Sequence, residues 1–175
     1  MDIIEVITSV HAAAAALFGE LEGLALDDRR TSDAMHLVVR LTVALKVHCH
    51  AEEHVLYEAV RTSNRQLAEL ALEGPYEHQV LDMMLDKLVL HRPGPELLAI
   101  LHVIKAQFEH HARREEELEM LPAIRAAVPD DERARLAQDL QDEKRRLRPQ
   151  VERLVGAPAR GAHDGRGFHV HGHRR

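Results

Sequence analysis

The sequence predicts an all-α protein: a bundle of four helices in up-down-up-down order, with an additional C-terminal helix. Apolar residues recur at intervals of three and four along almost the whole chain, and β-branched runs joined by two-residue turns are missing from it. A chain of 175 residues is long enough for one domain with a sizeable core. We therefore expect one domain over residues 1–155.

Prolines, glycines and capping residues set the expected helix boundaries. The expected helices cover residues 2–25, 34–61 after the capping cluster Thr31-Ser32-Asp33, 75–90, 96–121 and 130–155, with a short helical piece at 64–72. Pro75 suits the first turn of a helix, whereas Pro122 should kink or end one. Residues 156–175 are rich in Gly and His and almost lack large apolar side chains, so we predict a disordered tail there.

Composition excludes several classes of function. The chain has one cysteine, Cys49, which rules out an intramolecular disulfide and a zinc–thiolate cluster. A formal net charge of -6 argues against general nucleic-acid binding, which needs a basic surface. The N-terminal residues are acidic and no apolar run approaches the roughly 20 residues that span a bilayer. We expect a cytoplasmic protein that binds neither nucleic acid nor a membrane.

Histidine is unusually frequent, with 14 in the chain. Following the apolar stripe of each of the first four long helices, we find one histidine on every stripe, and two of the stripes also carry a glutamate four residues later. These residues are His11, His48 with Glu52, His78, and His111 with Glu115. Residues i and i+4 lie on the same face of an α-helix, so both side chains face one buried spot. Unpaired carboxylates in a core are unfavourable by several kcal/mol, and a divalent cation removes that cost.

The spacing of these histidines supports a single site. Successive members are separated by 37, 30 and 33 residues, which in antiparallel helices brings them to a similar height. The chain also repeats itself, because a lone histidine followed by a His-x-x-x-Glu-Glu helix occurs once in each half. Two carboxylates that can each bridge suggest two metal ions. The alternative is a helical interaction module in which the histidines are hydrogen-bonded core residues.

With Leu56-Tyr57, Glu77 and Leu121-Pro122, these residues resemble the hemerythrin-like, or HHE cation-binding, family over about residues 1–155. The resemblance implies that His11, His48, His78 and His111 are terminal ligands. It also implies that Glu52 and Glu115 bridge two iron ions (Fe2+/Fe3+) joined by an oxo or hydroxo group. Glu116 is the alternative to Glu115, because one extra residue separates this Glu pair from Pro122.

The resemblance further implies a small-molecule ligand, namely dioxygen, peroxide or nitric oxide, bound at an open coordination position for sensing or handling of oxygen, redox state or iron. A peroxide-consuming, catalase-like enzyme is the alternative. Gly74 stands where the oxygen carriers of the family have a second histidine one turn before His78. Reversible oxygen carriage is therefore the less favoured function.

Overall fold

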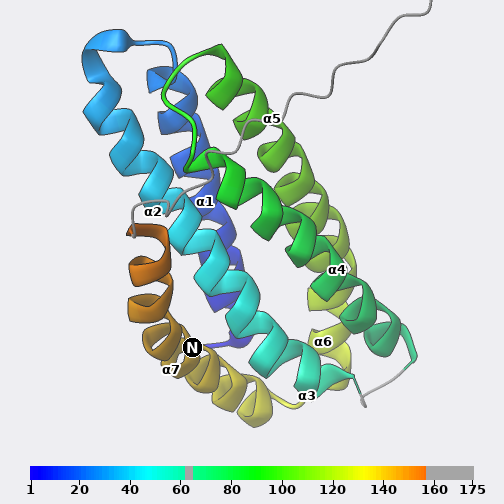
Figure 1. The fold of residues 1–175 in the computed structure, drawn as a ribbon. Coiled ribbons are helices and arrows are strands. Elements are labelled where there is room, and N and C mark those ends of the chain that lie inside the picture. Colours follow the sequence, from blue (N-terminus) through cyan, green and yellow to red (C-terminus); the bar gives the residue numbers. More distant parts are fainter. Residues whose placement is uncertain (62–64, 157–175) are drawn as a thin grey trace, which may run out of the picture.

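The computed structural model describes residues 1–61 and 65–156, and within these ranges it contains helices and turns but no strand (Figure 1). The long helices are α1 (Ile3–Leu24), α2 (Thr31–Glu52), α4 (Arg65–Leu88), α5 (Pro95–Glu109) and α7 (Asp130–Gly156). Shorter elements are the 3-10 turn η1 (Asp28–Arg30), α3 (Glu58–Val60) and α6 (Leu121–Ala127). Two π-helical segments, η2 (Glu53–Tyr57) and η3 (His110–Met120), continue α2 and α5. The all-α prediction is confirmed, whereas the expected disordered tail lies outside the described residues from 157 onward.

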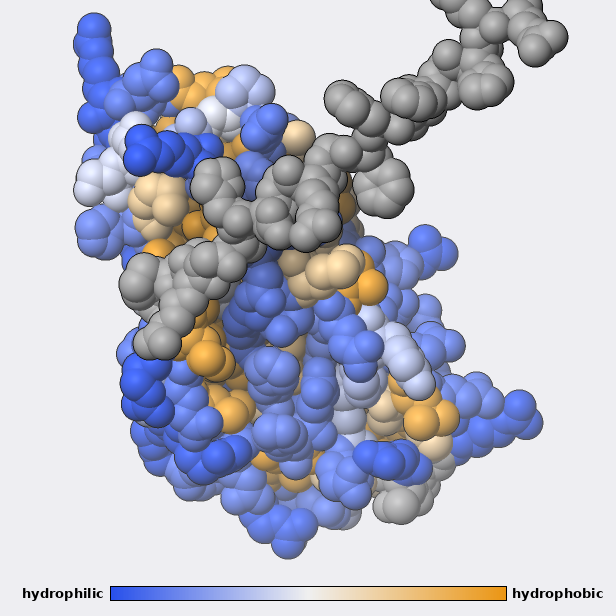
Figure 2. All heavy atoms as spheres, viewed as in Figure 1, coloured by the Kyte–Doolittle hydropathy of each residue, from blue (hydrophilic) through white to orange (hydrophobic). Residues whose placement is uncertain are grey.

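Four of the long helices enclose a common core. Helix α1 contacts α2 and α5, and α4 contacts the same two helices, an arrangement that is consistent with an up-down-up-down bundle (Figure 1). Helix α7 lies outside this group, against α2 and α1. It buries Leu136, Leu140, Leu147 and Val151, whereas Leu154, seven residues after Leu147, is exposed. The surface in this view is mainly hydrophilic, with scattered hydrophobic patches (Figure 2).

Helix α1 begins with a capping box. The Asp2 carboxylate accepts a hydrogen bond from the Ile4 N–H, and the Glu5 carboxylate accepts one from the Asp2 N–H. Among the described helices, only α1 is long and apolar enough to cross a bilayer, with a mean hydropathy of 1.4, whereas the sequence led us to expect no such run. Its apolar face, which includes Phe18 and Leu21, packs inside the bundle.

Helix α4 is continuous through Pro75, although we expected a break there. A proline inside a helix removes one hydrogen bond and is unfavourable by about 3 kcal/mol. Continuing the helix keeps all its buried residues on one face: Leu67, Ala71, Gly74, His78, Leu81, Leu85 and Leu88. Burying the side chains before Pro75 together with those after it offsets the lost hydrogen bond.

The core consists of two apolar clusters with a polar layer between them. The first cluster includes Ile7, Leu56 and Met120, and the second includes Phe18, Leu41, Leu81, Leu101 and Phe108. Along each of the four helical stretches, the chain passes from one cluster to the other through a buried histidine. The fold therefore brings the histidines of four helices to one level.

The two π-helical segments shift the helix faces relative to a regular α-helix. A π-helix bonds residue i to i+5 instead of i+4 and so contains one extra residue per turn. Beyond it, the position that faces the core is therefore one residue further along the sequence than in a regular α-helix. A regular helix would bury Leu118, seven residues after His111, but Leu118 is 72% exposed and Met120 is buried instead. The same shift after Glu52 buries Leu56 fully and leaves Val55 only partly buried.

Candidate metal centre

Six inward-facing side chains make up the polar layer, and each is at most 4% exposed: His11, His48, Glu52, His78, His111 and Glu116. The structure thus brings together five of the six ligands that we predicted. The sixth buried position belongs to Glu116, which the sequence had left as the alternative to Glu115.

The π-helical segment η3 explains why Glu116 takes this position. In a regular α-helix the residue facing His111 one turn later would be Glu115, but the wider π-helical turn aligns His111 with the residue five positions on. The Glu115 side chain instead lies at the edge of the layer, 19% exposed, with Oε1 3.0 Å from His110 Nε2. Burial and a hydrogen bond with Glu77 raise the pKa of Glu115 to about 7.

The inward donor atoms form two adjoining groups. His11, His48, Glu52 and Glu116 offer ligand atoms that all lie within 4.8 Å of one another, and the same holds for Glu52, His78 and His111. The Nε2 atoms of His78 and His111 are 3.0 Å apart. The histidines therefore fall into two pairs, His11 with His48 and His78 with His111.

Each carboxylate lies between the two pairs. Glu116 places Oε2 3.1 Å from His11 Nε2 and Oε1 3.7 Å from His111 Nε2. Glu52 places Oε2 3.5 Å from His48 Nε2 and 3.9 Å from His78 Nε2. Both glutamates are thus positioned to bridge.

Most of these donors lack a hydrogen-bond partner. Among the described residues, the buried side-chain atoms without one are His11 Nε2, both nitrogens of His48, both oxygens of Glu52, Glu116 Oε2 and, away from the layer, Thr42 Oγ1. Buried polar atoms are normally satisfied, and leaving them unpaired is unfavourable by several kcal/mol for a charged group. A cation between the six side chains would satisfy these atoms together, so the donor set fits a metal site.

The two buried glutamates respond differently to this environment. Burial and the neighbouring Glu116 raise the pKa of Glu52 well above its usual range, while Lys144 of α7 acts in the opposite direction. Burial also opposes ionisation of Glu116, but His111 and His11 hold its pKa well below the usual value. Without a cation, protonated imidazole can balance only one of the two carboxylates, and the second is driven towards its neutral form.

Burial lowers the pKa of His48 well below the usual histidine value and that of His78 to a smaller extent. Both therefore favour the neutral imidazole, which is the form that binds a metal ion. For His111, burial is outweighed by Glu116 and Glu77, which raise its pKa.

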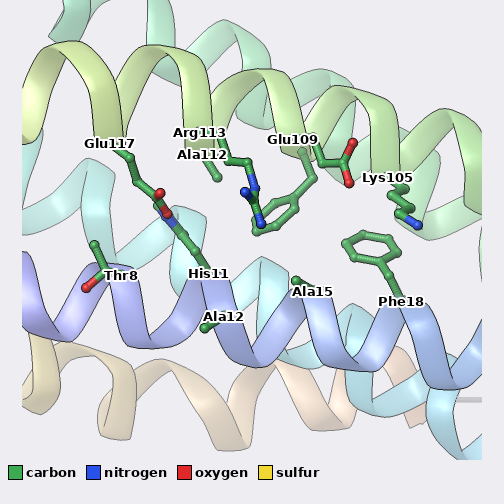
Figure 3. A pocket seen from close by; sticks show the side chains of 11 residues that line it. Thr8, His11, Ala12, Ala15, Phe18, Lys105, Glu109, Ala112, Arg113 and Glu117 are labelled. Atoms are coloured by element: carbon green, nitrogen blue, oxygen red, sulfur yellow. The ribbon is translucent and has the colours of Figure 1, made fainter.

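A second set of carboxylates holds three of the histidines from outside. Nδ1 of His11 donates to Glu117 at 2.9 Å, that of His78 donates to Glu53 at 2.9 Å and that of His111 donates to Glu77 at 2.7 Å. Figure 3 shows the Glu117 side chain reaching from η3 to His11 on α1. We did not predict these roles, although each glutamate directly follows or precedes a ligand candidate in the sequence.

Tyr57 also enters the polar layer, which the sequence did not indicate. Its hydroxyl donates to Glu116 Oε1 at 2.9 Å and its ring stacks on His78 with the ring centroids 5.5 Å apart. Gly74 gives this ring its space, because a Cβ there would lie 2.5 Å from Tyr57 Cε2. The position at which oxygen carriers have a second histidine is therefore next to a tyrosine ring.

A cavity of about 230 Å³ lies between α1 and the α5–η3 stretch and reaches the edge of His11 (Figure 3). Alanines at 12, 15 and 112 keep it open, and Lys105 and Arg113 are among its polar lining residues. A small molecule in this cavity would contact His11 and Glu117.

Three further histidines and the cysteine lie apart from the inward-facing donors. The side chains of His50, His54 and His110 are 40%, 51% and 47% exposed. Cys49 is buried away from the ligand groups, and burial raises the pKa of its thiol well above the usual value. It therefore stays a protonated packing residue.

The comparison with known families agrees with this geometry. The model of the hemerythrin HHE cation binding domain matches residues 2–119, more than half of the chain and a stretch that includes all six inward-facing ligand candidates. No curated protein and no solved structure matches the chain. Helices α6 and α7 lie beyond the matched residues. The chain belongs to the hemerythrin HHE cation-binding domain family.

Proposed function

We propose that this protein binds two iron ions in the polar layer and uses them to bind dioxygen, peroxide or nitric oxide. The observation that carries the proposal is the set of buried nitrogen and oxygen donors that converge from four helices, several of them without a hydrogen-bond partner. We further propose that the ligands are His11, His48, Glu52, His78, His111 and, in place of Glu115, Glu116.

The geometry favours two ions over one. A single ion would leave one pair of histidines without a cation, because the inward donors divide into two groups that share Glu52. Two ions would use all four imidazoles as terminal ligands, with Glu52 and Glu116 between them. Four imidazoles with two carboxylates suit iron, manganese or zinc, and the family resemblance favours iron.

The chain's own residues prepare the site for this role. Glu53, Glu77 and Glu117 accept hydrogen bonds from Nδ1 and so leave Nε2 of three imidazoles facing inward. Apolar clusters on both sides exclude water from the layer. When bound, iron would supply reversible one-electron redox chemistry and coordination of a small molecule.

The proposal is tested by metal analysis of the full chain produced with adequate iron. We expect about two iron ions per chain, with a strong loss on His48→Ala or His111→Ala, because each removes a terminal ligand and leaves a buried carboxylate uncompensated. His102→Ala is the matched control, since His102 is exposed and remote from the layer. Unchanged iron content in the His48→Ala/His111→Ala double variant would show that the metal is bound elsewhere.

A peroxide-consuming enzyme is the second candidate. If both ions are six-coordinate, four imidazoles and two bridging carboxylates fill about eight of roughly twelve positions. This leaves room for a substrate, and the cavity that His11 lines lies beside the polar layer. Iron-loaded protein should then consume hydrogen peroxide faster than an equal amount of free ferric ion. No excess over free ferric ion would leave binding or sensing as the function.

A further inference from the structure

We propose that the two metal positions differ in affinity, and that the position formed by His11 and His48 fills last and empties first. The inference rests on the metal-binding function proposed above. It comes from the hydrogen bonds made by the outward-facing nitrogens of the four histidines, not from the number of inward ligands.

Three of the four imidazoles have a carboxylate partner on Nδ1. A carboxylate in this place fixes the tautomer and the ring orientation and makes the inward nitrogen a better donor. In the His78–His111 pair both rings are held in this way, at 2.9 Å by Glu53 and at 2.7 Å by Glu77. This pair is therefore fully prepared for a cation.

His48 is the exception. Its side chain is 1% exposed, and neither of its ring nitrogens has a hydrogen-bond partner in the part of the chain that the structure describes. Its Nδ1 cannot turn to water, so one tautomer leaves an N–H without an acceptor and the other places the proton on the nitrogen that should bind the metal. Only His11 is held in this pair, by Glu117 at 2.9 Å.

The internal repeat shows where the missing partner would be. The residue after each inward glutamate holds a histidine of the opposite half: Glu53 holds His78 and Glu117 holds His11. Within the second half, Glu77, the residue before His78, accepts a hydrogen bond from His111. The corresponding residue before His11 is Val10, which has no polar side chain. Three of the four supporting positions are therefore glutamate and the fourth is apolar.

Removal of one such carboxylate partner typically weakens metal binding 10- to 100-fold. We therefore expect two binding steps whose dissociation constants differ by about 10- to 100-fold. At one metal ion per chain, the ion should lie beside His78 and His111.

The test is a titration of metal-free protein with Co2+, followed by its visible absorption and by equilibrium dialysis. The wild type should show a tight and a weak step. Glu77→Ala should loosen the tight step by about 10-fold or more, and Glu53→Ala gives a second, independent test of the same step. Glu73→Ala is the matched control, an exposed glutamate one turn before Glu77 on α4 that makes no ion pair to any of the four histidines. It should change neither step.

Val10→Glu tests the converse, because a carboxylate there should tighten the weak step and leave the tight one unchanged. Two ions bound with equal affinity by the wild type would overturn the inference and leave the metal-binding proposal standing. Loosening of the weak step alone by both Glu77→Ala and Glu53→Ala would also overturn it. Absence of Co2+ binding by the wild type would instead remove the proposed function itself.

Discussion

Gly74→Ala should destabilise the protein, although alanine is the better helix former. Gly74 lies inside α4 with its Cα facing the ring of Tyr57. An added Cβ would meet Tyr57 Cε2 at 2.5 Å and both Cζ and the hydroxyl at 2.7 Å, whereas ordinary contact begins at 3.4 Å. The ring cannot stay in place, and its hydrogen bond to Glu116 depends on that place.

The magnitude follows from opposing effects. Replacing glycine by alanine inside a helix stabilises by about 0.5–1 kcal/mol. Overpacking in a core typically costs about 1–3 kcal/mol. Loss of the buried hydrogen bond from Tyr57 adds about 1–3 kcal/mol, because the acceptor is a charged carboxylate. We therefore expect a net loss of about 1–5 kcal/mol in the free energy of unfolding. A larger side chain, such as the imidazole of the oxygen carriers, would meet the same ring.

Urea unfolding of metal-free protein, followed by circular dichroism, measures this effect. The decisive control is the same substitution in a Tyr57→Leu background, in which the ring is absent. There Gly74→Ala should stabilise the protein by up to about 1 kcal/mol, so the sign of its effect should reverse. If Gly74→Ala stabilises the wild type as well, the contact with Tyr57 does not decide the packing of this position.

Three further predictions concern separate features. Glu116→Gln should lower the iron content of the protein strongly whereas Glu115→Gln should not, because only Glu116 is buried in the polar layer; iron analysis of both variants distinguishes them. Against its partial burial, the Ile4 N–H and the Arg133 guanidinium hold the pKa of Asp2 below its usual value. Its charge therefore stabilises the fold above the usual pKa and ceases to do so as the pH falls through the lowered pKa, so Asp2→Asn should reduce the urea midpoint at pH 7 and lose this effect in acid. Removal of residues 157–175 should leave iron content and helicity unchanged, which iron analysis and circular dichroism of the shortened chain can check.

The helical class and the histidine layer could be predicted because both depend on the helical period alone. A buried stripe repeats at intervals of three and four, so His11, His48 and His78 could be placed from the positions of apolar neighbours. The continuity of α4 could not, because Pro75 is a local signal for a helix start. Whether the helix breaks there depends on what the residues before Pro75 bury, which is a property of the folded bundle.

Glu116 was harder to predict for a different reason. Glu115, Glu116 and Glu117 follow one another, so a shift of the helix face by one residue still leaves a glutamate facing the core. The supporting carboxylates were missed as well. A glutamate next to a ligand in the sequence is predicted to face solvent unless the position of the neighbouring helix is known. Only distances between helices show that Glu117 reaches His11.

Deletion of Glu115 tests whether the π-helical segment exists to accommodate one extra residue. In the first half of the repeat Glu52 follows His48 by four positions, whereas in the second half Glu116 follows His111 by five. Without Glu115, Glu116 would follow His111 by four residues, so a regular α-helix would place both on the same face. Later buried residues such as Met120 would stay on the face that packs into the core.

We expect the shortened chain to keep its iron and to unfold at an equal or higher urea concentration. Deletion of Met83 is the matched control, because Met83 is 53% exposed but lies in the regular helix α4, where its loss should displace the buried Leu85 and Leu88 that follow it. That variant should lose several kcal/mol of stability through disrupted core packing. Loss of iron on deletion of Glu115, with iron retained in Glu115→Gln, would mean that the π-helical geometry itself, and not merely the inward position of Glu116, is needed to form the site.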